Sequence, residues 1–477
     1  MTVRSTFFGL EIGRLGLQAH QKQLEITSHN MANASTEGYS RQRGEMTTTQ
    51  PFTYPAFNRV QTAGQMGTGV EVTAVMRIRD ELIDDQIHRE TTISGYWESR
   101  QTMLDEMELI VNEPSDFNIR TAVDSFWKSI QGVANNATSI PARSVLRQDT
   151  LTMTELIRQD YQRMKSLRNV ANERIKEQVN HINAFAGKIA MLNDQISKVT
   201  VMNDHANDLM DQRDLLIQEL SEMVKVSKTT DRFNRVNISI NGIALVQDIT
   251  ANKIVVEPDQ SDEGMVKLVW ADLGREVDVL GGSLKGLLEV RDQDLPEFLN
   301  HLDNFAKTLI AEVNSCHRLG YGLDESTNVN FFSGTGAADI DLSDDIKDIE
   351  NGLNRIAASS SIVDTEEGLE GNNHVMKEIY QIFDQRLLNN STATMGEYIG
   401  AVVADLGEKT NAAKVKFEGQ TRLIASLDER RESVCGVSLD EEMTNMVRFQ
   451  HGYNAAARII STMDEMLDVI VNRLKVV

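Results

Sequence analysis

Residues 439–474 carry mainly apolar side chains in a strict alternation of four- and three-residue steps, and this spacing strongly limits the folds open to the chain. Two of the eleven positions, Gln450 and Asp464, are polar. Further apolar side chains flank the row, so the helix would be too apolar to stand alone in water. The row consists of Leu439, Met443, Met446, Gln450, Tyr453, Ala457, Ile460, Asp464, Leu467, Val471 and Leu474. We therefore predict a long C-terminal helix that packs against a partner.

The N-terminal segment predicts a second helix of this kind, from about Thr2 to Ala34. One apolar row repeats every seven residues and consists of Leu10, Leu17, Leu24 and Met31. A second series steps mainly by three or four residues and consists of Phe8, Ile12, Leu15, Ala19 and Ile26. The combined stripe is broad enough to contact more than one neighbour. A polar loop follows, in which Gly38 can adopt the positive φ of a turn.

The interior predicts long helices around a small β region. The segment from Pro141 to about residue 226 reads as helix, with apolar steps of three or four over 164–199 and a break at 203–205. Residues 228–281 alternate as strands, and Asn241-Gly242 is a strong hairpin signal. Helices are also expected over 77–111, 116–137, 283–318 and from 374 to the end, with extended chain over 47–75 and loops over 320–373. The predicted fold is mainly α with a smaller β part, and it is elongated and multi-domain.

The composition argues against several functions. The net charge of −23, without a compensating basic run, disfavours nucleic-acid binding. No apolar run is long enough for a membrane-spanning helix, so no membrane insertion is expected. The N-terminus lacks the apolar core of a cleaved signal peptide. Cys316 and Cys435 form no CxxC motif and are interpreted as isolated thiols.

No motif predicts catalysis, a metal or a cofactor. The glycine-rich segment 281–286 lacks the residues of a phosphate-binding loop. The aspartates between 339 and 348 lack the glycine and the terminal glutamate of a calcium loop. The Asp211–Asp214 segment is interpreted as a salt-bridge and packing element. We therefore expect a protein that is not an enzyme and needs no cofactor.

Two terminal motifs carry a resemblance to a known family. The pattern N-x-x-N-x-x-T-x-G-Y-x-R is formed by Asn30, Asn33, Thr36, Gly38, Tyr39 and Arg41. Together with residues 438–467, it resembles the signatures of the bacterial flagellar axial proteins, which include rod, hook and hook-associated proteins. The segments 207–214, 281–288 and 311–321 are similar to the first hook–filament junction member of that family. Alternatives are a hook or rod protein, a cytosolic coiled-coil scaffold, or an unrecognised hydrolase.

The resemblance implies a structural subunit of the bacterial flagellum at the junction between hook and filament. It implies an inner coiled-coil assembly domain (1–60 plus 431–477), a bundle of long helices (61–227 plus 282–430) and a small β domain (228–281). The subunit would leave the cytoplasm by type III export without a cleaved signal peptide and end up extracellular. Its partners would be the hook protein, the second junction protein, neighbouring copies in a ring and a cytosolic export chaperone.

The resemblance also assigns the site residues. The N-terminal row 10–31 and the motif residues Asn30 to Arg41 would form one assembly interface. The C-terminal row 439–474 would form another and would bind the chaperone. We further expect both ends to be largely disordered in the isolated subunit and to fold on assembly.

Overall fold

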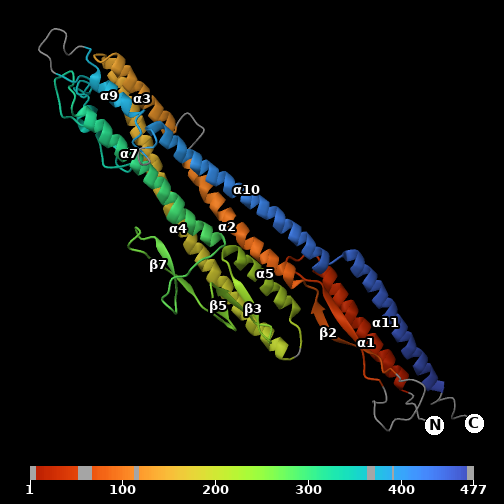
Figure 1. Cartoon of the computed structure of the whole chain (residues 1–477). Coiled ribbons are helices and arrows are strands. Elements are labelled where there is room, and N and C mark those ends of the chain that lie inside the picture. Colours follow the sequence, from red (N-terminus) through yellow and green to blue (C-terminus); the bar gives the residue numbers. More distant parts are fainter. Residues whose placement is uncertain are drawn as a thin grey trace, which may run out of the picture.

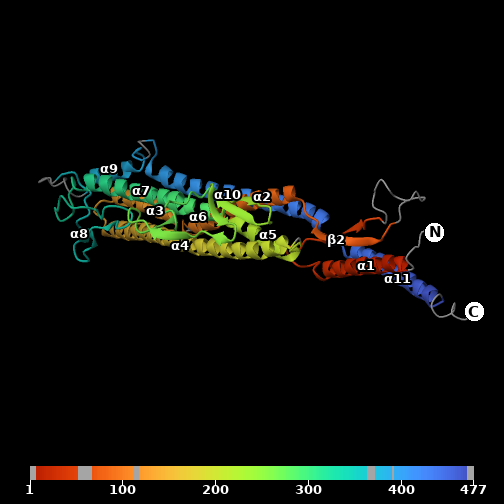
Figure 2. The ribbon, with the colours of Figure 1, turned by 90° about the horizontal axis from the view of Figure 1, so that it is seen from below.

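The computed structural model describes residues 7–51, 67–111, 118–202, 204–361, 371–388 and 392–469. The molecule is long and narrow, and both termini lie at the same end (Figures 1 and 2). Helices α1 (Phe8–Ala32) and α11 (Leu439–Asp468) lie side by side at that end. No helix among the described residues is both long and apolar enough to cross a membrane. The predicted class, mainly α with a smaller β part, is confirmed.

Two paired strands pack against α1 and complete the terminal module, which we define as α1, β1 (Gln42–Thr48), β2 (Val70–Arg77) and α11. The strands are antiparallel, from Gln42 opposite Arg77 to Thr48 opposite Val70, with an irregularity at Glu45. The extended chain predicted around Val70 is confirmed. The start of β1 at Gln42 was not predicted, because its polar residues show no apolar alternation.

The remaining long helices form a bundle that extends away from the terminal module (Figure 1). They are α2 (Glu81–Val111), α3 (Ile119–Asn135), α4 (Ile140–Val201), α5 (Asn207–Met223), α6 (Ser283–Glu289), α7 (Leu295–His317), α9 (His374–Ile382) and α10 (Met395–Cys435). A π-helical turn, Val290–Asp294, joins α6 to α7. The predicted break between α4 and α5 is confirmed.

The core of the bundle follows the predicted apolar row of α4. Its members from Met164 to Ile182 are buried, as are Ile189, Leu192 and Ile196. The row from Met164 to Ile189 belongs to one continuous core that also contains side chains of α2, α3, α7 and α10. The three- and four-residue steps keep the row on one face, and burial of that face stabilises the long helix.

The helical tract predicted from 374 to the end is confirmed over much of its described part. It is divided into α9, α10 and α11. Thr394 and Glu397 form a reciprocal capping box at the start of α10, while α10 ends at Gly436 and the Ser438 hydroxyl caps α11. These caps satisfy the backbone groups at the helix ends, which a continuous helix would bond internally. The chain therefore begins a new helix at Met395 and another at Leu439.

The β region lies against α4, beside α5 (Figure 1). A four-stranded sheet contains, in order, β3 (Ser227–Thr230), β4 (Val236–Ile240), β5 (Ile243–Gln247) and β6 (Thr250–Ala251). Strands β7 (Ile254–Pro258) and β8 (Val266–Trp270) form a separate pair. The predicted turn at Asn241-Gly242 is confirmed, with φ of 45° and 82°. The predicted strand at 276–280 is reduced to one bridge between Glu276 and Val269.

Residues 320–373 are mostly loop where described, as predicted, with short pieces β9 (Phe332–Ser333), β10 (Asp341–Leu342) and α8 (Asp344–Lys347). Within the aspartate cluster there, Asp341 pairs with Arg158 at 2.8 Å and with Lys347 at 2.6 Å. Cys316 and Cys435 are free thiols, as the sequence indicated.

Candidate assembly interface

The two terminal helices are antiparallel and approach each other along glycines. Gly9, Gly13 and Gly16 of α1 face Met463, Ile460 and Ala456 of α11. A Cβ added at Gly13 would lie 2.9 Å from Ile460 Cγ1. On the opposite helix, a Cβ added at Gly452 would lie 2.5 Å from His20 Cε1. We call this contact the glycine seam, and its closeness depends on the missing side chains.

The predicted row of α1 lies beside this seam. Leu10, Leu17, Leu24 and Met31 are half-buried. The second predicted series contacts the hairpin: Leu15 packs on Gly69, and Ile26 packs on Gly44. The sequence therefore identified a helix with more than one apolar contact, but the residues of the closest contact were not predicted because they are glycines.

The predicted row of α11 is rotated away from α1 along much of its length. The buried residues of α11 are Glu442 and Ala456, each one position before a predicted row member. Leu439 and Met443 are both 52% exposed, and Gln450 and Asp464 are exposed. Met446, Tyr453, Ala457, Ile460 and Leu467 are half-buried, whereas Val471 and Leu474 lie outside the described residues. Of the nine described members of this row, four are therefore exposed and none is fully buried in the single chain.

The motif residues gather where the two terminal helices meet the loop after α1. Asn30 is buried, and its Nδ2 donates to the Gln42 carbonyl oxygen at 2.9 Å and to Glu442 Oε2 at 3.1 Å. Its Oδ1 accepts from the Gln42 N–H at 3.0 Å and from the Tyr39 hydroxyl at 2.8 Å. Arg41 Nε donates to Glu442 Oε1 at 2.9 Å, and Nη1 donates to Glu441 at 2.7 Å. The N-terminal motif therefore holds the first turn of α11.

The other motif residues shape the loop. Asn33 ends α1, since its Nδ2 donates to the His29 carbonyl oxygen at 3.0 Å. The Thr36 hydroxyl donates to Asn33 Oδ1 at 3.3 Å, and the Tyr39 N–H donates to the Thr36 carbonyl oxygen at 3.2 Å. Gly38 has a φ of +75° and packs against Leu215 of α5. A side chain at residue 38 would strain this turn.

An ionic network fixes the terminal module to α5. Arg77 Nη1 lies 2.7 Å from Asp211 and 2.9 Å from Asp214, and Arg79 Nη1 lies 2.6 Å from Asp214. Ser40 donates to Asp211 through both its N–H, at 3.0 Å, and its hydroxyl, at 2.8 Å. The salt-bridge interpretation of 211–214 fits this geometry. Arg77 is the last residue of β2 and Arg79 follows shortly after it, so the hairpin and the motif loop bind the same helix.

Burial affects the carboxylates of this network differently. Burial raises the pKa of Asp211 above its ordinary value, although Arg77 and Ser40 oppose the shift. Burial also acts to raise the pKa of Asp214, but Arg79 and Arg77 together hold it below its ordinary value. Burial, together with Asp208, Asp211 and Glu442, raises the pKa of Tyr39, so its hydroxyl stays protonated. The two aspartates therefore remain paired with the arginines, and the Tyr39 hydroxyl remains a hydrogen-bond donor.

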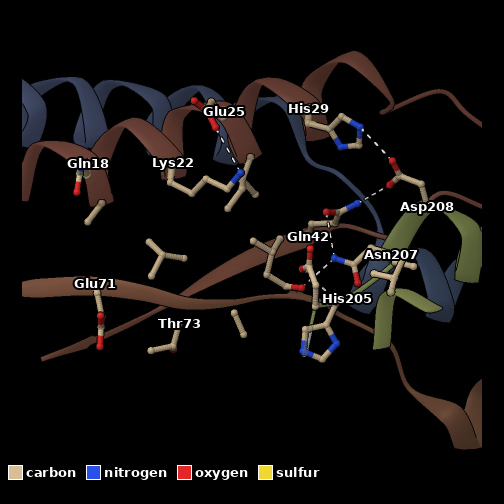
Figure 3. Close-up of a pocket in the computed structure, with 18 of the residues that line it drawn as sticks. Gln18, Lys22, Glu25, His29, Gln42, Glu71, Thr73, His205, Asn207 and Asp208 are labelled. Atoms are coloured by element: carbon tan, nitrogen blue, oxygen red, sulfur yellow. Dashed lines mark hydrogen bonds and ion pairs between the residues drawn. The ribbon is translucent and has the colours of Figure 1, made fainter. Parts of the chain in front are cut away.

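A groove of ≈ 950 Å³ lies between α1, β2 and residues 199–209 (Figure 3). At one end of the groove, Gln42 Nε2 donates to Asp208 Oδ1 at 2.7 Å, and His29 Nε2 lies 3.5 Å from Asp208 Oδ2. Along α1, Lys22 pairs with Glu25 at 3.4 Å. In the described ranges, no group of three or more His, Cys, Asp and Glu side chains is placed to hold a metal ion. The polar side chains at this end of the groove therefore link α1 and β1 to α5.

Several residues of this site were not singled out by sequence reasoning. Glu442 and Ser40 lie inside the quoted motifs, but the sequence assigned them no role. Gln42 and Arg79 were likewise assigned no role. The adjacent acids Glu441 and Glu442 at the start of a predicted apolar helix were the available signal, because buried acids require cationic partners.

Three family models match parts of the chain. Residues 104–332 match the flagellar hook-associated protein FlgK helical domain. Residues 10–39 match the flagella basal body rod protein family, and residues 433–474 match the flagellar basal body rod FlgEFG protein C-terminal family. The last two cover the glycine seam except Gly9, and most of the motif.

Whole-length relatives agree with these matches. Flagellar hook-associated protein 1 of Bacillus subtilis (strain 168) is 30% identical over 511 residues, covering 99% of this chain and 99% of that protein. The protein of the same name from Escherichia coli (strain K12) is 25% identical, covering 96% and 98%. The solved flagellar hook junction protein FlgK from Burkholderia pseudomallei has a TM-score of 0.62 at 15% identity, covering 73% of this chain and all of that one. This last likeness supports the fold.

Proposed function

Because the chain belongs to the family of flagellar hook-associated protein 1, we propose that it assembles through its terminal helices as a structural subunit of the hook–filament junction. The glycine seam closes one side of each terminal helix, while Leu439 and Met443 of the C-terminal row, and Val447 beside it, stay more than half exposed. An exposed apolar row of this kind marks an interaction surface. This row is the observation that carries the proposal.

Neighbouring copies of the chain are the proposed occupants of that row. Gln450 and Asp464 interrupt it and would set the register between copies at some cost in stability. The N-terminal row, Leu10 to Met31, and the motif residues would complete the interface. The subunit would contact the hook protein on one side of a ring and the second junction protein on the other.

Export is the second part of the proposal. The subunit would leave the cytoplasm by the type III route without a cleaved signal peptide, and a cytosolic chaperone would cover α11 until then. The exposed apolar side chains of α11 support this, because they favour association in water. We propose no enzymatic activity, in keeping with the structural role of the relatives.

We also propose three functional parts. The inner assembly domain, predicted as 1–60 plus 431–477, is best extended to Arg77, because β2 pairs with β1. The helical bundle, predicted as 61–227 plus 282–430, would then begin with α2. The small β domain, residues 228–281, would lie on the outer surface.

Matched valine substitutions on two exposed helices test the assembly proposal. Val447 of α11 is 52% exposed, and Val415 of α10 is 56% exposed. In a strain lacking the protein, Val447→Asp is expected to leave hooks without filaments in electron micrographs, whereas Val415→Asp restores filaments. Normal filaments with Val447→Asp would refute the proposal. Loss of the hook itself in the deletion strain would instead indicate a hook or rod protein.

A further inference from the structure

A second cavity lies outside the terminal module, between α2, α5, β3 and the loop before α6. Its volume is ≈ 620 Å³, which is within the range of ligand sites. Its apolar lining includes Ile217 and Val226, and Ile93 and Leu280 stand 43% and 51% exposed. The cavity can therefore accept an apolar side chain.

The lining is cationic, although the whole chain carries a net charge of −23. It includes four Lys or Arg side chains and two carboxylates: Arg89, Lys225, Lys228, Lys285, Asp85 and Glu289. Lys228 pairs with Asp85 at 2.7 Å, and Lys285 lies 3.6 Å from Glu289, which also accepts from Arg100 at 3.0 Å. Within the described ranges, Arg89 and Lys225 form no ion pair. An excess of positive charge remains to attract an anionic partner.

His88 also lines this cavity. Burial, together with the charge of Lys228, lowers the pKa of His88 to about 4. The carboxylates Asp84, Asp85 and Asp214 act in the opposite direction without restoring the ordinary value. The His88 imidazole is therefore neutral at pH 7, and the positive charge of the lining comes from its Lys and Arg side chains.

Strand β3 supplies an open sheet edge beside this cavity. It is the first strand of its sheet, and all four of its residues are exposed. In the described part of the chain, no backbone hydrogen bond joins Ser227–Thr230 to anything other than β4. Such an edge can pair with an added strand, and an edge lysine such as Lys228 discourages pairing with most segments. An acidic strand is the exception, because its carboxylates can pair with Lys228.

We propose that the outer edge of β3 and this cavity bind an extended acidic peptide segment of a partner protein. Its backbone would pair with β3, its acidic side chains would face Arg89, Lys225 and Lys228, and an aliphatic side chain would enter the cavity. This site is independent of the terminal helices. Its occupant is therefore distinct from the proposed neighbours in a ring.

Fluorescence anisotropy with the full-length protein tests the proposal. The probes are a labelled peptide of four Glu-Val repeats, a Lys-Val repeat of equal length, and the Glu-Val peptide with every backbone nitrogen methylated. The Glu-Val peptide is expected to bind about tenfold or more tightly than either control. Equal binding of the Lys-Val peptide, or unchanged binding of the methylated peptide, would overturn the proposal. Absence of Glu-Val binding would also overturn it.

Variants locate the site. A Lys225→Glu and Lys228→Glu double variant is expected to weaken Glu-Val binding by about tenfold, whereas Lys253→Glu, on an exposed position between β6 and β7, leaves it unchanged. Should the double variant lose its circular dichroism signal, Lys225→Gln replaces it, with about a threefold loss expected. Unchanged binding in a folded variant would contradict the site. Protein dimers dispersed by the Glu-Val peptide would identify a second copy as the occupant and overturn the assignment to another protein.

Discussion

Asn30 and Glu442 are 412 positions apart in the sequence and share a buried hydrogen bond of 3.1 Å, from Asn30 Nδ2 to Glu442 Oε2. Arg41 Nη2 lies 2.7 Å from the other carboxylate oxygen of Glu442. The last turns of α1 and the first turn of α11 are thereby joined through one buried acid. This contact is at the base of the terminal module, where the chain enters the bundle.

Removal of the Glu442 carboxylate is expected to loosen both terminal helices. Glu442→Ala removes the buried carboxylate that Asn30 Nδ2 and the guanidinium of Arg41 share, and leaves Arg41 with only the exposed Glu441, at a cost on the order of 3 kcal/mol. Hydrogen–deuterium exchange should accelerate in α1 and α11 but not in α4. Glu441→Ala is the matched control, because the Glu441 side chain is 63% exposed and its ion pair contributes at most about 1 kcal/mol. Equal acceleration in both variants would contradict the role of Glu442.

The glycine seam predicts sensitivity to a single methyl group. Gly13→Ala places a Cβ 2.9 Å from Ile460 Cγ1, so α11 must shift away from α1 and lose contact along the seam. We expect about 1–3 kcal/mol of local destabilisation, measured by hydrogen exchange in α11. Gly187→Ala, in α4, meets nothing within 4 Å and should stabilise the protein by about 0.5–1 kcal/mol. A seam variant as stable as the wild type would show that the helices are not in close contact.

The contact between α1 and α11 within one chain changes what we expect of the two ends in the isolated subunit. The sequence predicted disordered ends, yet α1 and α11 bury Asn30 and Glu442 against each other without a second copy. We therefore expect a variant lacking residues 1–40 and 437–477 to lose circular dichroism equal to the 25 residues of α1 and the 30 residues of α11. An unchanged total helix signal would mean that the ends are unfolded until assembly.

Local patterns predicted the parts of the fold that depend on neighbours in sequence. The row from Met164 to Ile196 identified the buried face of α4, and Asn241-Gly242 identified the hairpin. The motif residues Asn30, Tyr39 and Arg41 do converge on one site. In each case, a short-range periodicity or turn preference agrees with the tertiary structure.

Other features could not be predicted in this way. The glycine seam has no apolar signal, because close approach depends on absent side chains. Strand β1 contains Arg43, Gly44 and Glu45, and it is extended because β2 pairs with it rather than through its own preference. The partner of Glu442 is distant in sequence, so no local pattern could identify it. The exposed residues of α11 could be identified only from the position of α1, which covers the other side of the helix.

Acid is expected to destabilise the end of the bundle opposite the terminal module through His317. This side chain is fully buried, its Nδ1 lies 2.8 Å from the Val329 carbonyl oxygen, and its Nε2 accepts the Ala357 N–H at 2.9 Å. Burial, with a contribution from Arg143, lowers the pKa of His317 to about 4. The unfolded chain takes up the proton near pH 6.5, so His317 contributes fully to stability above that pH and progressively less as the pH falls to about 4.

Urea unfolding at pH 7, 5.5 and 4.5 measures this contribution. The wild-type free energy of unfolding should fall more steeply with decreasing pH than that of His317→Gln, by up to about 1.4 kcal/mol per pH unit. His317→Gln should also be less stable at pH 7, because it loses buried hydrogen bonds. His181→Gln, at an exposed position of α4, should keep the wild-type slope. His88, whose pKa is also lowered to about 4, is present in every variant, so the difference in slope isolates His317. Parallel slopes for wild type and His317→Gln would mean that this histidine is not a buried neutral group.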